Sequence, residues 1–93
     1  MSTEEFMIEL DGVINTIHTY TKNPFMVGYT KALREAVDNR DYRMIQMILD
    51  RVLDWYTQYL SAIEEDEYVF NKTMHHRAYN ILKVYRQSIH ASA

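Results

Sequence analysis

The chain has 93 residues, of which 47% are hydrophobic and 25% charged, and its formal net charge is -3. This composition excludes a disordered, highly charged chain, and no run of about 18 uncharged apolar residues indicates a membrane span. The absence of cysteine excludes disulfides, thiol catalysis and thiolate metal sites. The first residues are acidic, unlike an export signal, so we expect a single helical domain over residues 1–93 in the cytoplasm.

The first predicted helix covers residues 3–22. Ser2 and Glu5 form a capping box, in which two side chains satisfy free backbone amides at a helix start. Gly12 interrupts the helix and should weaken it by about 1 kcal/mol relative to alanine. The apolar residues recur in steps that build one stripe: Phe6, Leu10, Val13, Ile14 and Ile17.

The second predicted helix covers residues 24–38. Asn23 is a good N-cap, and Pro24 suits the first helical position. Its apolar stripe comprises Met26, Tyr29, Leu33, Ala36 and Val37. Asp38 and Asn39 then predict a turn and the N-cap of the next helix.

The third predicted helix covers residues 40–63 and has the most regular pattern. Its seam alternates steps of three and four: Tyr42, Ile45, Leu49, Val52, Tyr56, Tyr59 and Ile63. Such a seam is typical of a helix that packs against another helix. The partner helix belongs either to the same chain or to a second copy in a homodimer.

The fourth predicted helix covers residues 67–90, with its inward side formed by Phe70, Met74, Ala78, Ile81, Tyr85 and Ile89. No glycine or proline separates it from the third helix, so the two are either distinct or continuous. Short connections favour antiparallel neighbours. We therefore predict an all-α fold, a compact antiparallel bundle of about four helices that homodimerisation could complete.

No catalytic or metal motif is present, so we expect no enzyme, no cofactor and no metal. His75 and His76 point about 100° apart on a helix and cannot easily share one ion; both project outward from the predicted stripe. Asp50 and Asp54 share a helical face, but that face is opposite the seam and points to water. The two glycines form no phosphate-binding loop.

Two surfaces remain as candidate partner-binding sites. On the fourth helix, cations and aromatic rings interleave on one face that could bind phosphates, stack bases or contact an acidic protein: Tyr68, Lys72, His76, Tyr79, Lys83 and Arg86. On the third helix, a flank outside the seam carries residue types that dominate protein interfaces: Met44, Met47, Arg51 and Trp55. The alternatives are a solvated helix face and, for Trp55, the edge of the core.

Arg77 projects into the apolar stripe of the fourth helix, where a lone charge is costly. We expect it to pair with an acid of another helix or another chain.

These observations favour a non-enzymatic binding protein that inhibits or neutralises a macromolecular partner, with a protein as that partner and no membrane involvement. Small acidic helical proteins of this kind resemble phage-encoded inhibitors of host or defence machinery, immunity proteins and antitoxins, in size and class rather than in motif. A nucleic-acid-binding module that uses the fourth helix is the alternative, against which the negative net charge argues. A small enzyme or ligand-binding bundle with a tyrosine-lined pocket is a third hypothesis.

Overall fold

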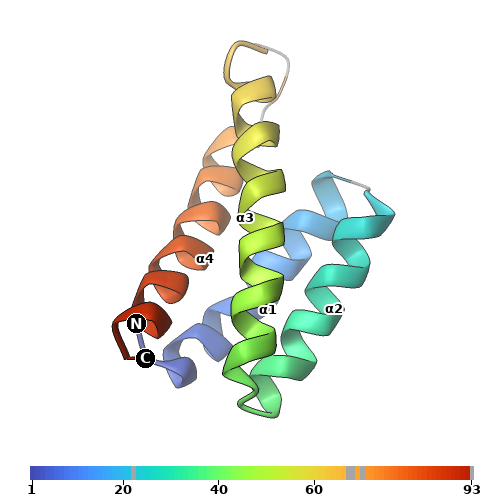
Figure 1. Ribbon diagram of the computed structural model, residues 1–93. Helices are drawn as coiled ribbons and strands as arrows, with labels where there is room; N and C mark the ends of the chain where they lie inside the picture. Colours follow the sequence, from blue (N-terminus) through green and yellow to red (C-terminus); the bar gives the residue numbers. More distant parts are fainter. Residues whose placement is uncertain (22, 67–68, 70, 93) are drawn as a thin grey trace.

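The computed structural model describes residues 1–21, 23–66, 69 and 71–92. These residues form four helices: α1 (Thr3–Tyr20), α2 (Pro24–Asp38), α3 (Tyr42–Glu64) and α4 (Lys72–Ser92). Each helix runs antiparallel to the next, and α1 and α3 each lie between α2 and α4 (Figure 1). The all-α four-helix bundle predicted from the sequence is confirmed.

Local signals at the starts of α1 and α2 act as predicted. The Ser2 hydroxyl accepts a hydrogen bond from the Glu5 amide at 3.1 Å, and the Glu5 carboxylate accepts one from the Ser2 amide at 3.3 Å. The Asn23 side chain caps α2, whose first residue is Pro24. α1 ends at Tyr20 rather than at residue 22, and residue 22 lies outside the described part of the chain.

The turn between α2 and α3 differs from the prediction. Asp41, not Asp38 or Asn39, caps α3, because its carboxylate accepts a hydrogen bond from the Met44 amide at 3.2 Å. Arg40 adopts a left-handed conformation with φ of 55°. This residue reverses the chain at the end of α2, a position that most often holds glycine. The extra residues of the turn explain why α3 begins at Tyr42 rather than at residue 40.

The helices α3 and α4 are distinct, which settles the alternative that the sequence left open. α3 ends at Glu64, and α4 begins at Lys72 rather than at residue 67. The Asp66 amide donates to the Ile63 carbonyl at 3.1 Å, so the chain forms a turn directly after α3 instead of starting the next helix there. Residues 67, 68 and 70 lie outside the described part of the chain.

The predicted stripes of α1, α2 and α3 form most of the core. Of their residues, Ile14 and Tyr59 are half-buried and Tyr29 and Tyr42 are exposed, whereas the others are buried. α3 also buries Ile48 and Leu60. Because the α3 seam is covered by other helices of the same chain, the fold does not need a second copy to bury it.

The stripe predicted for α4 is confirmed in part, because Ala78, Tyr85 and Ile89 are buried. Met74 is exposed and Ile81 is half-buried. The buried side of α4 also includes His75 and Leu82, which the prediction left out. The buried residues of α4 follow steps of three and four, and the centre of their stripe is turned from the predicted one by less than the 100° that separates adjacent residues. The Tyr85 ring stacks on Phe6 of α1, with ring centroids 3.9 Å apart.

None of the helices in the described part of the chain is both long and apolar enough to cross a lipid bilayer.

Candidate interaction surfaces

The basic face of α4, which comprises Lys72, His76, Tyr79, Lys83 and Arg86, is directed toward α3. Tyr68 was predicted to extend this face, but it lies outside the described residues. At its C-terminal end, the Arg86 Nε donates to the Asp50 carboxylate at 2.8 Å. In the middle, the Tyr79 and Thr57 hydroxyls lie 3.3 Å apart.

The same face meets the C-terminal end of α3. The Lys72 ammonium donates to the Glu64 carbonyl at 3.0 Å, and the His76 Nε2 lies 3.3 Å from the Glu64 carboxylate. The Lys83 ammonium lies 5.9 Å from the centre of the Tyr79 ring. Lys72 and Arg86 therefore contact α3, whereas Lys83 is exposed and lies near a ring of its own helix.

No helix in the described part of the chain covers the opposite flank of α3. Met47 is 59% exposed and Met44 is 43% exposed, although both have large apolar side chains. Trp55 is half-buried and packs against the core, and its ring stacks on Tyr59 at 4.9 Å. Arg43 and Arg51 are exposed on the same side of the helix. We call these five residues, Arg43, Met44, Met47, Arg51 and Trp55, the outer face of α3.

Two aromatic residues of α2 border the outer face of α3. Thr30 and Arg34 of α2 contact α1, so Phe25 and Tyr29 occupy the other edge of α2, toward α3. Phe25 is 78% exposed. Sequence reasoning missed Phe25, which is apolar but falls outside the predicted stripe, and it also missed Arg43.

Arg77 lies at the edge of α4 rather than within the apolar stripe, because the helix is rotated. Its side chain is largely exposed, and its guanidinium lies 3.8 Å from the Glu9 carboxylate of α1. The expected acidic partner on another helix is confirmed.

His75 corrects the prediction that both adjacent histidines point outward. His75 is fully buried, whereas His76 is exposed. The His75 Nδ1 lies 2.6 Å from the Tyr56 hydroxyl, and its Nε2 has no hydrogen-bond partner among the described residues. The rings of Tyr20 and Tyr59 approach it edge-on. Burial lowers the pKa of His75 and raises the pKa of Tyr56, because the apolar surroundings disfavour both charged forms.

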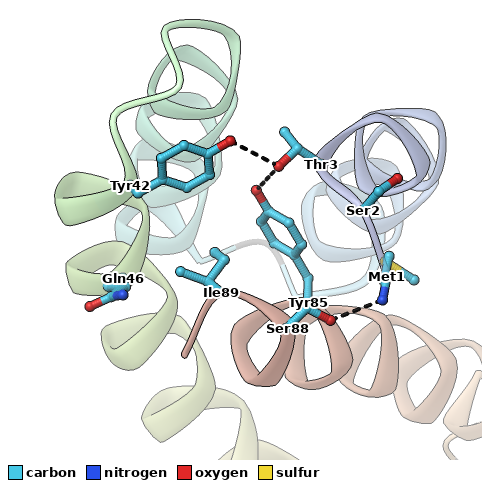
Figure 2. Close-up of a pocket in the computed structure, with 8 residues that line it drawn as sticks. All are labelled: Met1, Ser2, Thr3, Tyr42, Gln46, Tyr85, Ser88 and Ile89. Atoms are coloured by element: carbon cyan, nitrogen blue, oxygen red, sulfur yellow. Dashed lines mark hydrogen bonds between the residues drawn. The ribbon is translucent and has the colours of Figure 1, made fainter. Parts of the chain in front are cut away.

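A cavity of about 420 Å³ opens at the end of the bundle where α1 begins (Figure 2). The Thr3 hydroxyl lies 3.3 Å from the Tyr42 hydroxyl and 3.1 Å from the Tyr85 hydroxyl. The other lining residues are Met1, Ser2, Gln46, Ser88 and Ile89. These side chains offer hydroxyl and amide groups for hydrogen bonding, among them the phenols of Tyr42 and Tyr85, and include no carboxylate or imidazole.

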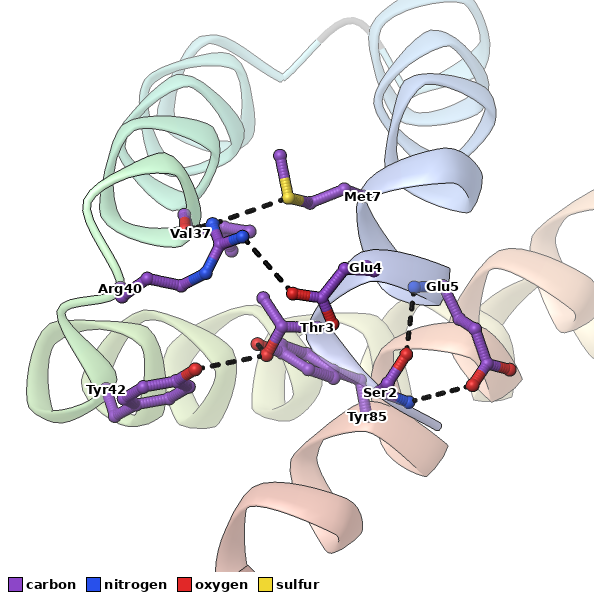
Figure 3. A network of polar contacts seen from close by, with 9 residues as sticks. All are labelled: Ser2, Thr3, Glu4, Glu5, Met7, Val37, Arg40, Tyr42 and Tyr85. Atoms are coloured by element: carbon purple, nitrogen blue, oxygen red, sulfur yellow. Dashed lines mark hydrogen bonds and ion pairs between the residues drawn. The ribbon is translucent and has the colours of Figure 1, made fainter.

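Polar contacts beside this cavity tie the start of α1 to the turn between α2 and α3 (Figure 3). The Arg40 guanidinium donates to the Val37 carbonyl at 2.9 Å and to the Glu4 carboxylate at 3.4 Å. These contacts hold Arg40 in its left-handed conformation, which costs free energy in a residue other than glycine. Their role is therefore structural.

Asp50 and Asp54 are both exposed, as the sequence predicts, and Asp50 is paired with Arg86. Among the described residues, no three His, Asp or Glu side chains lie where they could together hold a metal ion.

The chain is thus a helical bundle in which one flank of α3 makes polar contacts with α4. The other flank, the outer face of α3, is exposed. No protein-family model matches this chain. It is similar to a protein of Bacillus subtilis (strain 168) named "Uncharacterized protein YddK", with 25% identity over 80 residues. The match covers 86% of this chain and 30% of that protein, so the chain spans less than a third of its relative's length. No solved structure matches.

Proposed function

We propose that the chain is a non-enzymatic helical binding protein that inhibits or neutralises a protein partner by covering part of its surface. The observation that carries this proposal is the outer face of α3, where Met44 and Met47 are exposed beside the half-buried Trp55. Aromatic residues, methionine and arginine are enriched at protein interfaces. A phage-type inhibitor or an immunity or antitoxin-like protein would act in this way.

Energetics favour this flank over the other candidate surface. A partner that covers Met47 removes apolar surface from water, which contributes up to about 1.5–3 kcal/mol for a fully buried side chain. A partner on the basic face of α4 must compete with the contacts that Arg86 and Lys72 already make to α3.

The nucleic-acid alternative is less favoured for the same reason, and it has a simple test. It predicts a mobility shift at low salt that Lys83→Glu and Arg86→Glu abolish, because phosphate binding depends on cations. The proposed protein-binding function predicts no such shift.

The direct experiment compares two methionines of one chain. Met47→Asp on the outer face of α3 should abolish the retention of a protein from a bacterial lysate by the immobilised chain. Met74→Asp is the matched control, because Met74 is 42% exposed and lies on α4. Circular dichroism of both variants checks that each is folded. No retained protein at micromolar concentration, or equal loss in both variants, would contradict the proposal.

A further inference from the structure

The arginines of the chain fall into two groups by their surroundings. Four of them pair with a carboxylate of α1 or α3: Arg34, Arg40, Arg77 and Arg86. Within the described part of the chain, Arg43 and Arg51 have no carboxylate within 4 Å, and both are exposed on the outer face of α3. The two unpaired guanidinium groups therefore lie on the surface that we propose as the docking site.

The spacing of these arginines is regular. Arg43, Met47 and Arg51 occupy positions i, i+4 and i+8 and so follow one line along α3. Eight residues of helix rise by about 12 Å, with the methionine midway. Trp55 continues this line one turn beyond Arg51, and Met44 lies beside the line. An exposed apolar side chain is thus flanked by a free guanidinium about one helical turn away in each direction.

We infer that the partner presents an acidic amphipathic helix to this face. Its apolar residue covers Met47, and an Asp or Glu about one turn to each side pairs with Arg43 and Arg51. Arginine forms charge-assisted hydrogen bonds with carboxylates, and these bonds are stronger than those between neutral groups. This inference rests on the proposed function, because it names the chemistry of the partner at the same surface.

The surroundings favour a peptide over nucleic acid. Asp54 is exposed one turn beyond Arg51 on the same side of α3, and a run of phosphates along this line would meet its negative charge. Met44, Met47 and Trp55 supply apolar area that suits the apolar side of a helix. A partner helix with two separate carboxylates can reach both arginines and keep clear of Asp54.

Opposite effects of neighbouring charges test the inference. Arg43→Gln and Arg51→Gln should each weaken binding by about 2- to 5-fold, which is the range of exposed ion pairs. Asp54→Asn should strengthen binding by about 2-fold, because it removes a like charge from the path of an acidic partner. Lys31→Gln is the matched control: Lys31 is an exposed cation of α2 beside the groove with α1, and its loss should leave binding unchanged.

The probe is a displayed library of helical peptides with a fixed leucine stripe and flanks randomised among Glu, Gln and Lys. Selection on the immobilised full chain should enrich Glu one turn to each side of a central leucine. Selected peptides should also lose binding to the Met47→Asp variant and show the charge effects given above.

The outcomes separate the two proposals. Peptides that need Met47 but show no enrichment of Glu, or that are insensitive to Arg43→Gln and Arg51→Gln, would overturn the acidic partner and leave the docking face intact. Selection of no peptide that needs Met47 would overturn both. A single-stranded oligonucleotide that binds this face and is released by the arginine variants would overturn the peptide in favour of nucleic acid.

Discussion

The two flanks of α3 are built from similar residues but are used differently. The flank toward α4 places Asp50, Thr57 and Glu64 opposite the basic face of α4, where their polar groups find partners. The outer face carries arginines without a carboxylate partner among the described residues and methionines without a covering helix. The sequence of one helix therefore does not show which of its charged residues are free to bind a partner, because some of them pair with a neighbouring helix.

The comparison also separates stability from binding. Contacts between α3 and α4 hold the bundle together, so changes there should alter the free energy of unfolding. Changes on the outer face should alter the association with a partner and leave the fold intact.

The largest expected difference contrasts a buried residue of α4 with an exposed residue of α3. Leu82→Ala should lower the free energy of unfolding by about 2–5 kcal/mol, because Leu82 is fully buried and its truncation leaves a cavity. Met47→Ala should change it by less than about 0.5 kcal/mol. Urea unfolding measures both values, and equal losses would contradict the division between the flanks.

A pH effect should come from His75, on the buried side of α4. Burial lowers the pKa of His75 in the folded state, so the unfolded chain binds a proton more readily. The stability from neutral His75 is therefore complete above about pH 6.5, the ordinary histidine pKa. It is lost as the pH falls below that value toward the folded pKa.

Thermal unfolding between pH 8 and pH 5 measures this effect. The wild-type chain should lose stability over the acidic part of the range, and His75→Gln should show a shallower dependence. The other three histidines, His18, His76 and His90, remain in both proteins, so the difference between the two curves belongs to residue 75. Parallel curves would show that His75 does not titrate on unfolding.

The smallest expected effect concerns ion pairs across the α3–α4 contact. A double-mutant cycle of Asp50→Asn and Arg86→Gln should give a coupling of about 0.2–1 kcal/mol that shrinks with salt, as for exposed pairs. The same cycle for Arg51→Gln with Asp54→Asn should give less coupling, because no ion pair joins these residues. A larger coupling for the second pair would weaken the case that Arg51 is free.

Local signals made much of the fold predictable. The capping box at Ser2 and the Asn23-Pro24 start of α2 act through residues close in sequence, so they can be predicted without a structure. The seam of α3 could also be predicted from the sequence, because one set of apolar residues dominates its periodicity.

The orientation of α4 was not predictable in this way. Its sequence supports two stripes with the same spacing, one through Met74 and Ile81 and one through His75 and Leu82. Apolar character favours the first, but the Tyr56 hydroxyl lies against the His75 Nδ1 and makes the second possible. That contact depends on the register between α3 and α4, which residue spacing within α4 does not encode.

The candidate site shows the same limit. Met44, Met47, Arg51 and Trp55 were visible as departures from the α3 seam. Arg43 and Phe25 became relevant only when the structure showed which cations are paired and which edge of α2 borders α3.

The methionine methyl groups offer the most direct test of the central claim that the outer face of α3 binds the partner. Methyl NMR of the chain, with and without a captured partner, reports on both sides of the bundle in one spectrum. The account predicts that the signals of Met44 and Met47 shift, while those of buried Met26 and of Met74 on α4 stay in place. A shift confined to Met74, or no shift at Met44 and Met47 on binding, would contradict it.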